Sequence, residues 1–148
     1  MHNAMARKLN LLVIDDDPAM VRLLTLVIER NLGDRMVVYG LSDPDEARRW
    51  LDQNCCDILI SDLQMPGIDG LDMLRFAKRR NAWTQVIFIT GHSTWDKIAE
   101  AVEYGASDYL LKPIDHHDLV TLLNQQYVRC ARWQTAVLGT LQTAETDW

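Results

Sequence analysis

Five residues that can carry chemistry stand at or directly after the ends of four short apolar runs: Asp15, Asp16, Asp62, Thr90 and Lys112. Crowded carboxylates repel one another and raise each other's pKa unless a cation joins them. A few oxygen ligands with positions left open for water suit Mg²⁺ better than a softer metal. A lysine and a hydroxyl nearby would then bind the anion that the metal recruits. Together, a carboxylate nucleophile, a divalent metal, a lysine and a hydroxyl are typical of phosphoryl transfer to an aspartate.

The stretch around Asp62 predicts how one of these carboxylates is presented. The apolar run before it is too short for a helix and is bounded by turn-forming residues, which favours a buried strand. Pro66, Gly67 and Gly70 then predict a stiff loop that can continue neither strand nor helix. Asp62 is therefore expected at the carboxyl end of a core strand, where open α/β sheets bind ligands. Asp69 is predicted to stabilise the turn before Gly70 rather than to bind metal.

Strand and helix patterns alternate along the chain. Nearly continuous apolar runs predict strands at residues 9–14, 36–39, 57–61, 85–90 and 107–111. Apolar residues at helical spacing predict helices that begin at residue 18, at 42–44, at 71, near 95 and near 115, with Asp17 as a cap of the first. This alternation, without hairpin signals, predicts an α/β fold with a doubly wound five-stranded parallel sheet, flavodoxin-like strand order 2-1-3-4-5 and an extended C-terminal helix. The carboxyl ends of all strands then share one edge, where the five residues meet.

Length and composition favour one soluble domain. At 148 residues and 48% hydrophobic content the chain can bury a core, and its net charge of −6 argues against nucleic acid as a direct partner. The N-terminus lacks an apolar signal core, and no apolar run approaches the roughly 20 residues that span a bilayer. Cys55, Cys56 and Cys130 make no disulfide framework and are predicted to be small buried residues in a reducing compartment. We therefore expect a cytoplasmic protein without a membrane partner.

Four motifs at matched spacing carry a resemblance to a known family: the acidic run that ends in Asp17-Pro18, the loop from Asp62 to Gly70, Thr90-Gly91 and Lys112-Pro113. Over about residues 9–127 the sequence resembles the receiver domain of two-component response regulators. The resemblance implies that Asp62 accepts a phosphoryl group from a phosphohistidine of a sensor histidine kinase or phosphotransfer protein. It also implies a phosphoacceptor switch that assists only its own phosphorylation and dephosphorylation, rather than an enzyme with an external substrate.

The same resemblance implies roles for the other site residues. The Mg²⁺ ligands would be Asp15, Asp16, Asp62 and the backbone carbonyl of Gln64. Asp16 would bind the ion directly, and Asp15 largely through water. Thr90 and Lys112 would contact the phosphoryl oxygens. Gln64 and His92 flank the site at positions that vary in the family and tune the lifetime of the phosphoryl group, and His92 is assigned no catalytic role.

A switch and its output are also implied by the resemblance. Thr90 would move toward the phosphoryl group, and Tyr109, at the family's aromatic switch position, would turn into the vacated space. The surface formed by the fourth helix, fifth strand and fifth helix would then change and meet a downstream protein target or an output domain missing from this chain. Lys112-Pro113 is expected to be cis. Ile114 stands where many receivers have phenylalanine.

We expect a disordered N-terminal segment at residues 1–8, a receiver domain at 9–127, and a C-terminal helical extension or linker stub at 128–148. The extension is too short for a DNA-binding output domain. Apolar and polar residues repeat there at alternating four and three spacing, like a short coiled-coil seam: Leu123, Tyr127, Cys130, Gln134, Val137 and Leu141. This spacing fits either a homodimer through the C-terminal helix or packing of the helix on its own domain.

Two other functions share part of this pattern. A Mg²⁺-dependent phosphatase with an aspartate nucleophile generally needs a second aspartate two residues later, where this chain has Gln64. Nucleotide or flavin binding would need a glycine- or hydroxyl-rich phosphate loop after the first strand, where Asp15, Asp16 and Asp17 would repel the ligand. Both patterns are less complete than the one for a phosphoacceptor switch.

Overall fold

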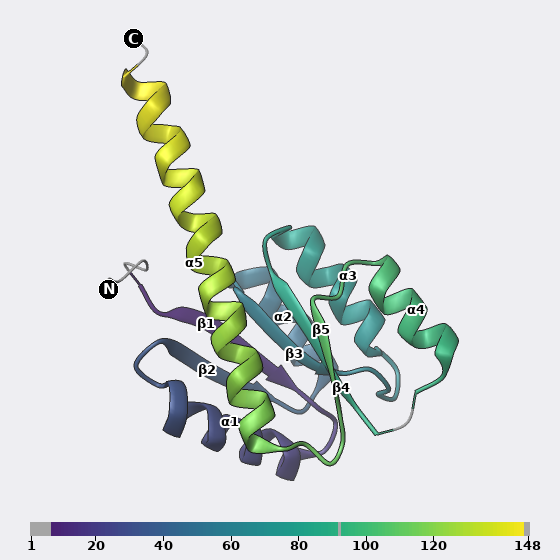
Figure 1. The fold of residues 1–148 in the computed structure, drawn as a ribbon. Helices are drawn as coiled ribbons and strands as arrows, with labels where there is room; N and C mark the ends of the chain where they lie inside the picture. Colours follow the sequence, from purple (N-terminus) through teal and green to yellow (C-terminus); the bar gives the residue numbers. More distant parts are fainter. Residues whose placement is uncertain (1–6, 92, 147–148) are drawn as a thin grey trace.

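The computed structural model describes residues 7–91 and 93–146, with side chains up to residue 140. Its sheet has five parallel strands in the order β2-β1-β3-β4-β5 (Figure 1). The strands are β1 (Leu9–Ile14), β2 (Met36–Leu41), β3 (Ile58–Asp62), β4 (Gln85–Thr90) and β5 (Asp108–Leu111). The helices are α1 (Pro18–Leu32), α2 (Pro44–Gln53), α3 (Gly70–Arg80), α4 (Trp95–Glu103) and α5 (His116–Thr146). The predicted fold class and strand order are confirmed.

Helices cover both faces of the sheet because successive strand residues point to opposite sides. On β4, Ile87 packs into a cluster with residues of α1 and α5, whereas Phe88 packs into a cluster with residues of α2, α3 and α4. Both side chains are fully buried. The three central strands therefore carry apolar residues on both faces, which explains their nearly continuous apolar sequence.

Two aspartates cap helices: Asp17, as predicted, and Asp69, which was predicted to stabilise the turn before Gly70. Asp17 is the N-cap of α1, and its carboxylate accepts a hydrogen bond from Ala19 N at 3.0 Å. Asp69 and Asp72 form a capping box at the start of α3, in which each side chain accepts from the backbone N–H of the other. Asp69 therefore stabilises the turn, and its side chain is not part of the carboxylate cluster described below.

Some predicted boundaries shift by one or two residues. β3 begins at Ile58 and includes Asp62, because Asp62 still pairs with Ile89 in the β3–β4 ladder. β2 continues to Leu41, whose ladder partner is Ile14 at the end of β1. The phosphoacceptor candidate is therefore the last residue of a strand rather than the first residue of a loop. Its backbone is held by the sheet.

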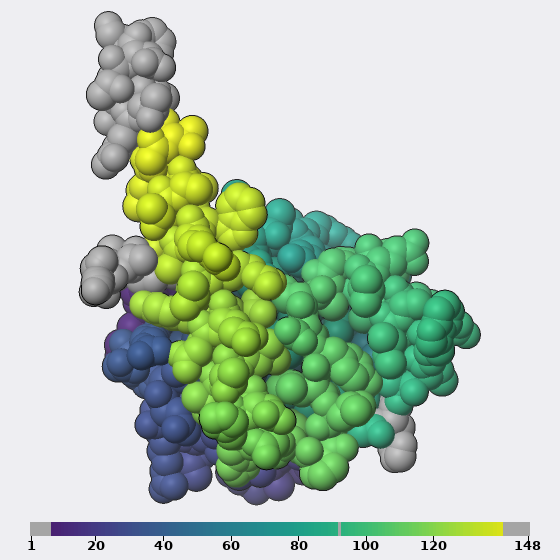
Figure 2. Space-filling model, in the orientation of Figure 1, coloured from purple at the N-terminus to yellow at the C-terminus, as the bar shows by residue number. Residues whose placement is uncertain are grey.

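Helix α5 is continuous through residues 116–146 and crosses the predicted boundary at residue 127. The first part of the predicted seam packs on the domain itself: Leu123 is fully buried, and Tyr127 and Cys130 lie against the same cluster. Farther along, Val137 is 42% exposed, and the yellow part of the helix extends beyond the rest of the molecule (Figure 2). The side chain of Leu141 lies outside the described residues. Packing on the domain therefore accounts for the first half of the seam, and the homodimer stays a prediction.

Two sequence-based predictions, disorder of the N-terminal segment and burial of the cysteines, differ in part from the structure. Of the N-terminal segment only Arg7 and Lys8 are described, and both are bonded: Arg7 pairs with Asp57, and Lys8 Nζ donates to a backbone carbonyl. Cys56 is buried as predicted and Cys130 is half-buried, but Cys55 is exposed in the loop before β3, so the prediction was wrong for Cys55. In the described part of the chain no helix is long and apolar enough to cross a membrane.

A methyl group at Gly70 has no room. A Cβ there would lie 2.4 Å from the carbonyl oxygen of Asp62 and 2.8 Å from Phe88 Cε1. We expect Gly70→Ala to lower the free energy of unfolding by about 2–3 kcal/mol, because the backbone that carries Asp62 must shift. Denaturant titration measures this change. Gly139→Ala is the control, since a Cβ there meets nothing within 4 Å, and its midpoint should not fall. Equal midpoints for Gly70→Ala and the unmodified protein would contradict the packing described.

Candidate phosphoacceptor site

Three carboxylates meet at the carboxyl edge of the sheet. Asp15 and Asp16 follow β1, Asp62 ends β3, and one oxygen from each lies within 4.8 Å of the others. Asp15 is only 2% exposed and Asp62 only 8% exposed, whereas Asp16 is open to solvent. Adjacent parallel strands place these residues side by side because their ends lie at the same edge.

Lys112 joins two of these carboxylates. Its ammonium Nζ donates to Asp15 Oδ2 and to Asp62 Oδ2, each at 2.9 Å. Burial alone would lower the pKa of Lys112, but the hydrogen bonds to Asp62 and Asp15 outweigh it, and the net shift of the pKa is upward. The lysine therefore stays protonated and positively charged at neutral pH.

The remaining bonds orient the carboxylates. Asp15 Oδ1 accepts from the backbone N–H of Asp17 at 2.9 Å, and Asp62 Oδ1 accepts from the backbone N–H of Gln64 at 3.1 Å. Each of the two buried carboxylates is thus held by a backbone donor on one oxygen and by Lys112 on the other. The Gln64 backbone lies beside Asp62, and its side chain points to solvent.

The cluster carries more negative charge than the lysine balances. The cluster has three carboxylates, and among the described side chains one ammonium group, that of Lys112, bonds to it. Desolvation, followed by the charge of Asp15, raises the pKa of Asp16. Hard oxygen donors with an uncompensated negative charge fit a divalent cation such as Mg²⁺, which keeps water in its remaining positions. The residues present therefore suit the metal that the sequence predicted.

Thr90 lies on β4, the neighbour of β3, and Tyr109 lies on β5, the next strand of the sheet. Thr90 ends β4, is 1% exposed, and its carbonyl accepts from the backbone N–H of Lys112 at 2.9 Å. Tyr109 pairs with Phe88 in the β4–β5 ladder, and its ring is half-buried against the α2, α3 and α4 cluster. Its hydroxyl is buried, with no hydrogen-bond partner among the described residues. Lys112-Pro113 is cis, as expected. His92 lies outside the described residues.

Two features on or near α4 were not predicted from the sequence. Lys97 of α4 lies 3.7 Å from Asp69, and both line a hollow with the loop that follows Asp62. Nothing in the spacing of residues 69 and 97 signals this contact. Exposed apolar side chains also lie on α4 and β5: Trp95, Ile98, Val102 and Leu111. The helical spacing of the first three was visible in the sequence.

The two histidines that begin α5, His116 and His117, are exposed and join no described carboxylate or thiol cluster.

Comparison with known proteins identifies the class of this domain. The family model of the response regulator receiver domain matches residues 11–124. The regulator NtrC of Salmonella typhimurium is 36% identical over 114 residues, which are 76% of this chain and 24% of NtrC. The regulator TrcR of Mycobacterium tuberculosis is 30% identical over 124 residues, 83% of this chain and 47% of TrcR. The chain therefore aligns with less than half of either regulator.

Solved structures agree with this result. A response regulator receiver domain protein from Clostridium thermocellum is 32% identical, with a TM-score of 0.75, over 82% of this chain and 95% of that one. The receiver domain of a LuxO repressor protein from Vibrio parahaemolyticus has a TM-score of 0.77 at 22% identity, which shows the shared fold. The chain belongs to the receiver domain family of two-component response regulators.

Proposed function

We propose that Asp62 accepts a phosphoryl group in a Mg²⁺-dependent reaction. The observation that carries this proposal is the Asp62 carboxylate, held at a strand end between Lys112 and two further carboxylates. One carboxylate oxygen of Asp62 attacks phosphorus as the phosphorus–nitrogen bond of a phosphohistidine breaks. The electron pair of that bond leaves with the imidazole. The product is an acyl phosphate on Asp62.

The chain's own residues have separate roles in this transfer. Lys112, already 2.9 Å from Asp62 Oδ2, would move its ammonium onto a phosphoryl oxygen, and the Thr90 hydroxyl would donate to another. Asp15, Asp16, Asp62 and the Gln64 carbonyl would hold Mg²⁺. The bound ion supplies charge neutralisation for the phosphoryl oxygens in a site that is otherwise anionic.

The proposed donor is a sensor histidine kinase or a phosphotransfer protein, in the cytoplasm. The output would be read on the surface formed by α4, β5 and α5, where Trp95, Val102 and Leu111 are 80%, 69% and 64% exposed. Phosphorylation adds charge and acceptor oxygens beside Thr90, and Tyr109 would turn inward in response. The unbonded Tyr109 hydroxyl supports this role, since the ring gives up no described hydrogen bond when it moves. A downstream protein or an output domain would bind the changed surface.

A phosphatase acting on external phosphoesters is less well supported. Gln64 stands two residues after Asp62, where such an enzyme needs an acid or base, and its side chain is an exposed amide that cannot transfer protons. The cluster suits uptake of a phosphoryl group by Asp62. It has no carboxyl group at position 64, where a phosphatase needs its acid or base. Self-association through the end of α5 would be a separate property and stays a prediction.

Removal of Mg²⁺ tests the proposal. We expect the protein, incubated with a small phosphodonor and Mg²⁺, to form one acid-stable, alkali-labile adduct, and to form none when a chelator removes the metal. The reason is that an incoming dianion meets uncompensated carboxylates without the metal. Intact-protein mass spectrometry measures the adduct. An equal yield with and without Mg²⁺, or turnover of an external phosphoester, would contradict the proposal.

A further inference from the structure

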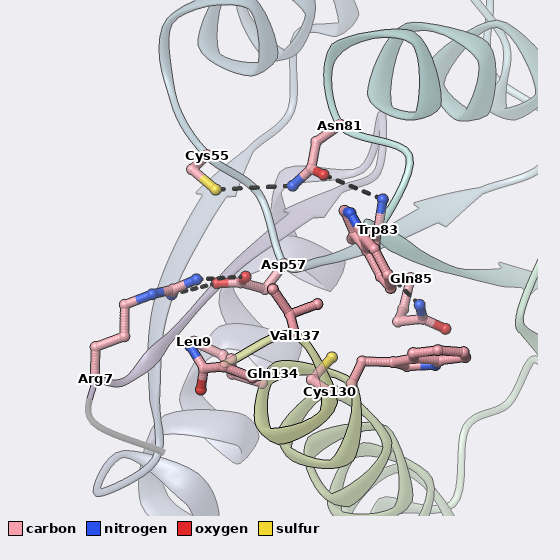
Figure 3. Close-up of a pocket in the computed structure, with 11 residues that line it drawn as sticks. Arg7, Leu9, Cys55, Asp57, Asn81, Trp83, Gln85, Cys130, Gln134 and Val137 are labelled. Carbon is pink, nitrogen blue, oxygen red and sulfur yellow. Dashed lines mark hydrogen bonds and ion pairs between the residues drawn. The ribbon is translucent and has the colours of Figure 1, made fainter. Parts of the chain in front are cut away.

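A cavity lies at the opposite end of the sheet from Asp62, and the proposed function does not use it. Its volume is about 250 Å³, and Figure 3 shows the side chains around it. Leu9 and Gln85 begin β1 and β4, Asp57 precedes β3, and Cys130, Gln134 and Val137 come from α5. The second half of α5 therefore forms one wall of the cavity, beside the amino ends of the strands.

The ionic side chains of this cavity neutralise each other. Arg7 binds Asp57 through two hydrogen bonds, at 2.7 and 2.9 Å, and Asp57 also accepts from the backbone N–H of Asn10 at 2.8 Å. Burial raises the pKa of the Cys130 thiol to about 11, so this group is neutral as well. Among the described lining residues no unpaired charge remains. A ligand that fits this cavity is therefore uncharged.

Aromatic rings form one side of the cavity. Trp83, before β4, and Trp133, on α5, meet edge to face with ring centroids 5.4 Å apart. Although both rings line the cavity, Trp83 remains 54% exposed and Trp133 remains 52% exposed. Exposed tryptophans beside apolar side chains such as Leu9 and Val137 favour a flat apolar molecule that covers the rings.

One polar group in the wall lacks a partner. Asn81 accepts from Trp83 N at 3.1 Å, and Gln85 donates to the Trp83 carbonyl at 3.0 Å and accepts from Ser107 Oγ at 2.8 Å. The Gln134 side-chain oxygen, in contrast, is buried and has no hydrogen-bond donor among the described residues. Gln134 lines the cavity, so a ligand N–H or O–H that reaches this oxygen would satisfy it.

We propose that this cavity binds a neutral, flat aromatic molecule of one or two rings that carries an N–H or O–H donor. The size agrees, since a cavity of roughly 150 Å³ is enough for benzene. The rings would lie against Trp83 and Trp133, and the donor would bond to Gln134. Such a ligand would hold the second half of α5 against the sheet, far from the phosphoacceptor.

Indole is a suitable probe, and the full chain is the protein to use. Titration followed by amide and indole N–H shifts in NMR should move Trp83, Trp133 and Gln134, with a dissociation constant of about 0.1–1 mM. N-methylindole, which lacks the donor, should bind about fivefold more weakly. Gln134→Leu should remove that difference between the two probes. An indole that carries a carboxylate should bind more weakly than indole itself.

A variant that fills the cavity tests the proposal, and the same substitution elsewhere on α5 is its matched control. Val137→Phe, on the exposed part of α5, should weaken indole binding at least about tenfold. Val128→Phe places the same ring on the same helix outside the cavity and should leave the affinity unchanged. The proposal is wrong if indole shifts none of the lining residues, if Val137→Phe binds indole as well as the unmodified protein, or if the charged probe binds equally. It is also wrong if Val137→Phe changes only the elution volume, because the cavity would then be an interface with a second copy.

Discussion

Asp62→Asn is expected to abolish uptake of the phosphoryl group from a small phosphodonor, by more than about 10³-fold. The amide keeps the shape of the carboxylate, and its oxygen can still accept from Lys112, but it lacks the nucleophilic oxygen that attacks phosphorus. The fold should be retained, because one of three mutually repelling carboxylates is removed. The rate of adduct formation in the presence of Mg²⁺, followed by mass spectrometry, measures the effect.

Asp57→Asn is the matched control for this substitution. Asp57 lies beside the amino end of the same strand and is paired with Arg7 rather than with Lys112. Its replacement should leave the rate of phosphorylation unchanged, although the free energy of unfolding should fall as the ion pair with Arg7 is lost. An adduct in Asp62→Asn at the rate of the unmodified protein would refute the assignment of Asp62.

Lys112→Met should have the second-largest effect on the reaction. Among the described side chains, Lys112 is the one cation bonded to both Asp15 and Asp62. Without its ammonium group, the negative charge that develops on the phosphoryl oxygens during the transfer would lose a hydrogen-bond donor. Removal of a single preorganised donor of this kind costs about 10²-fold in rate. We therefore expect phosphorylation to slow by about that factor, with Asp62 still the only residue modified.

Lys8→Met is the control for the loss of a lysine. Lys8 is exposed, donates to the carbonyl of Gly33, and precedes the amino end of β1, at the opposite end of that strand from Asp15. Its substitution should leave the rate of phosphorylation unchanged. If Lys112→Met and Lys8→Met react equally fast, the ammonium of Lys112 does not contact the transferred group.

The meeting of the site residues was predictable because all strands of a parallel sheet have their carboxyl ends at the same edge. Once strands were assigned to residues 9–14, 57–61 and 107–111, their carboxyl ends had to share one edge, and Asp15, Asp62 and Lys112 came with them. The structure adds which atoms meet. That Lys112 bonds to Asp15 and Asp62 rather than to Asp16 depends on side-chain geometry, which sequence spacing does not specify.

Features that depend on distant contacts were not predictable in the same way. The pair between Arg7 and Asp57 joins residues fifty positions apart, and no local pattern marks it. Leu123 and Cys130 have the spacing of a coiled-coil seam, yet they pack on their own domain, because the same apolar stripe suits either partner. Cys55 is exposed and Cys56 is buried in the loop between α2 and β3, a difference that residue type alone does not predict.

The most direct test of the central claim locates the phosphoryl group itself. The protein is phosphorylated with a small phosphodonor and Mg²⁺, reduced with borohydride, which converts an aspartyl phosphate to homoserine, and digested for peptide sequencing by mass spectrometry. We predict homoserine at position 62 alone, and none when Mg²⁺ is withheld. Homoserine at Asp15 or Asp16 instead, or a phosphoryl group that resists reduction and resides on another residue type, would contradict the assignment of Asp62 as the phosphoacceptor.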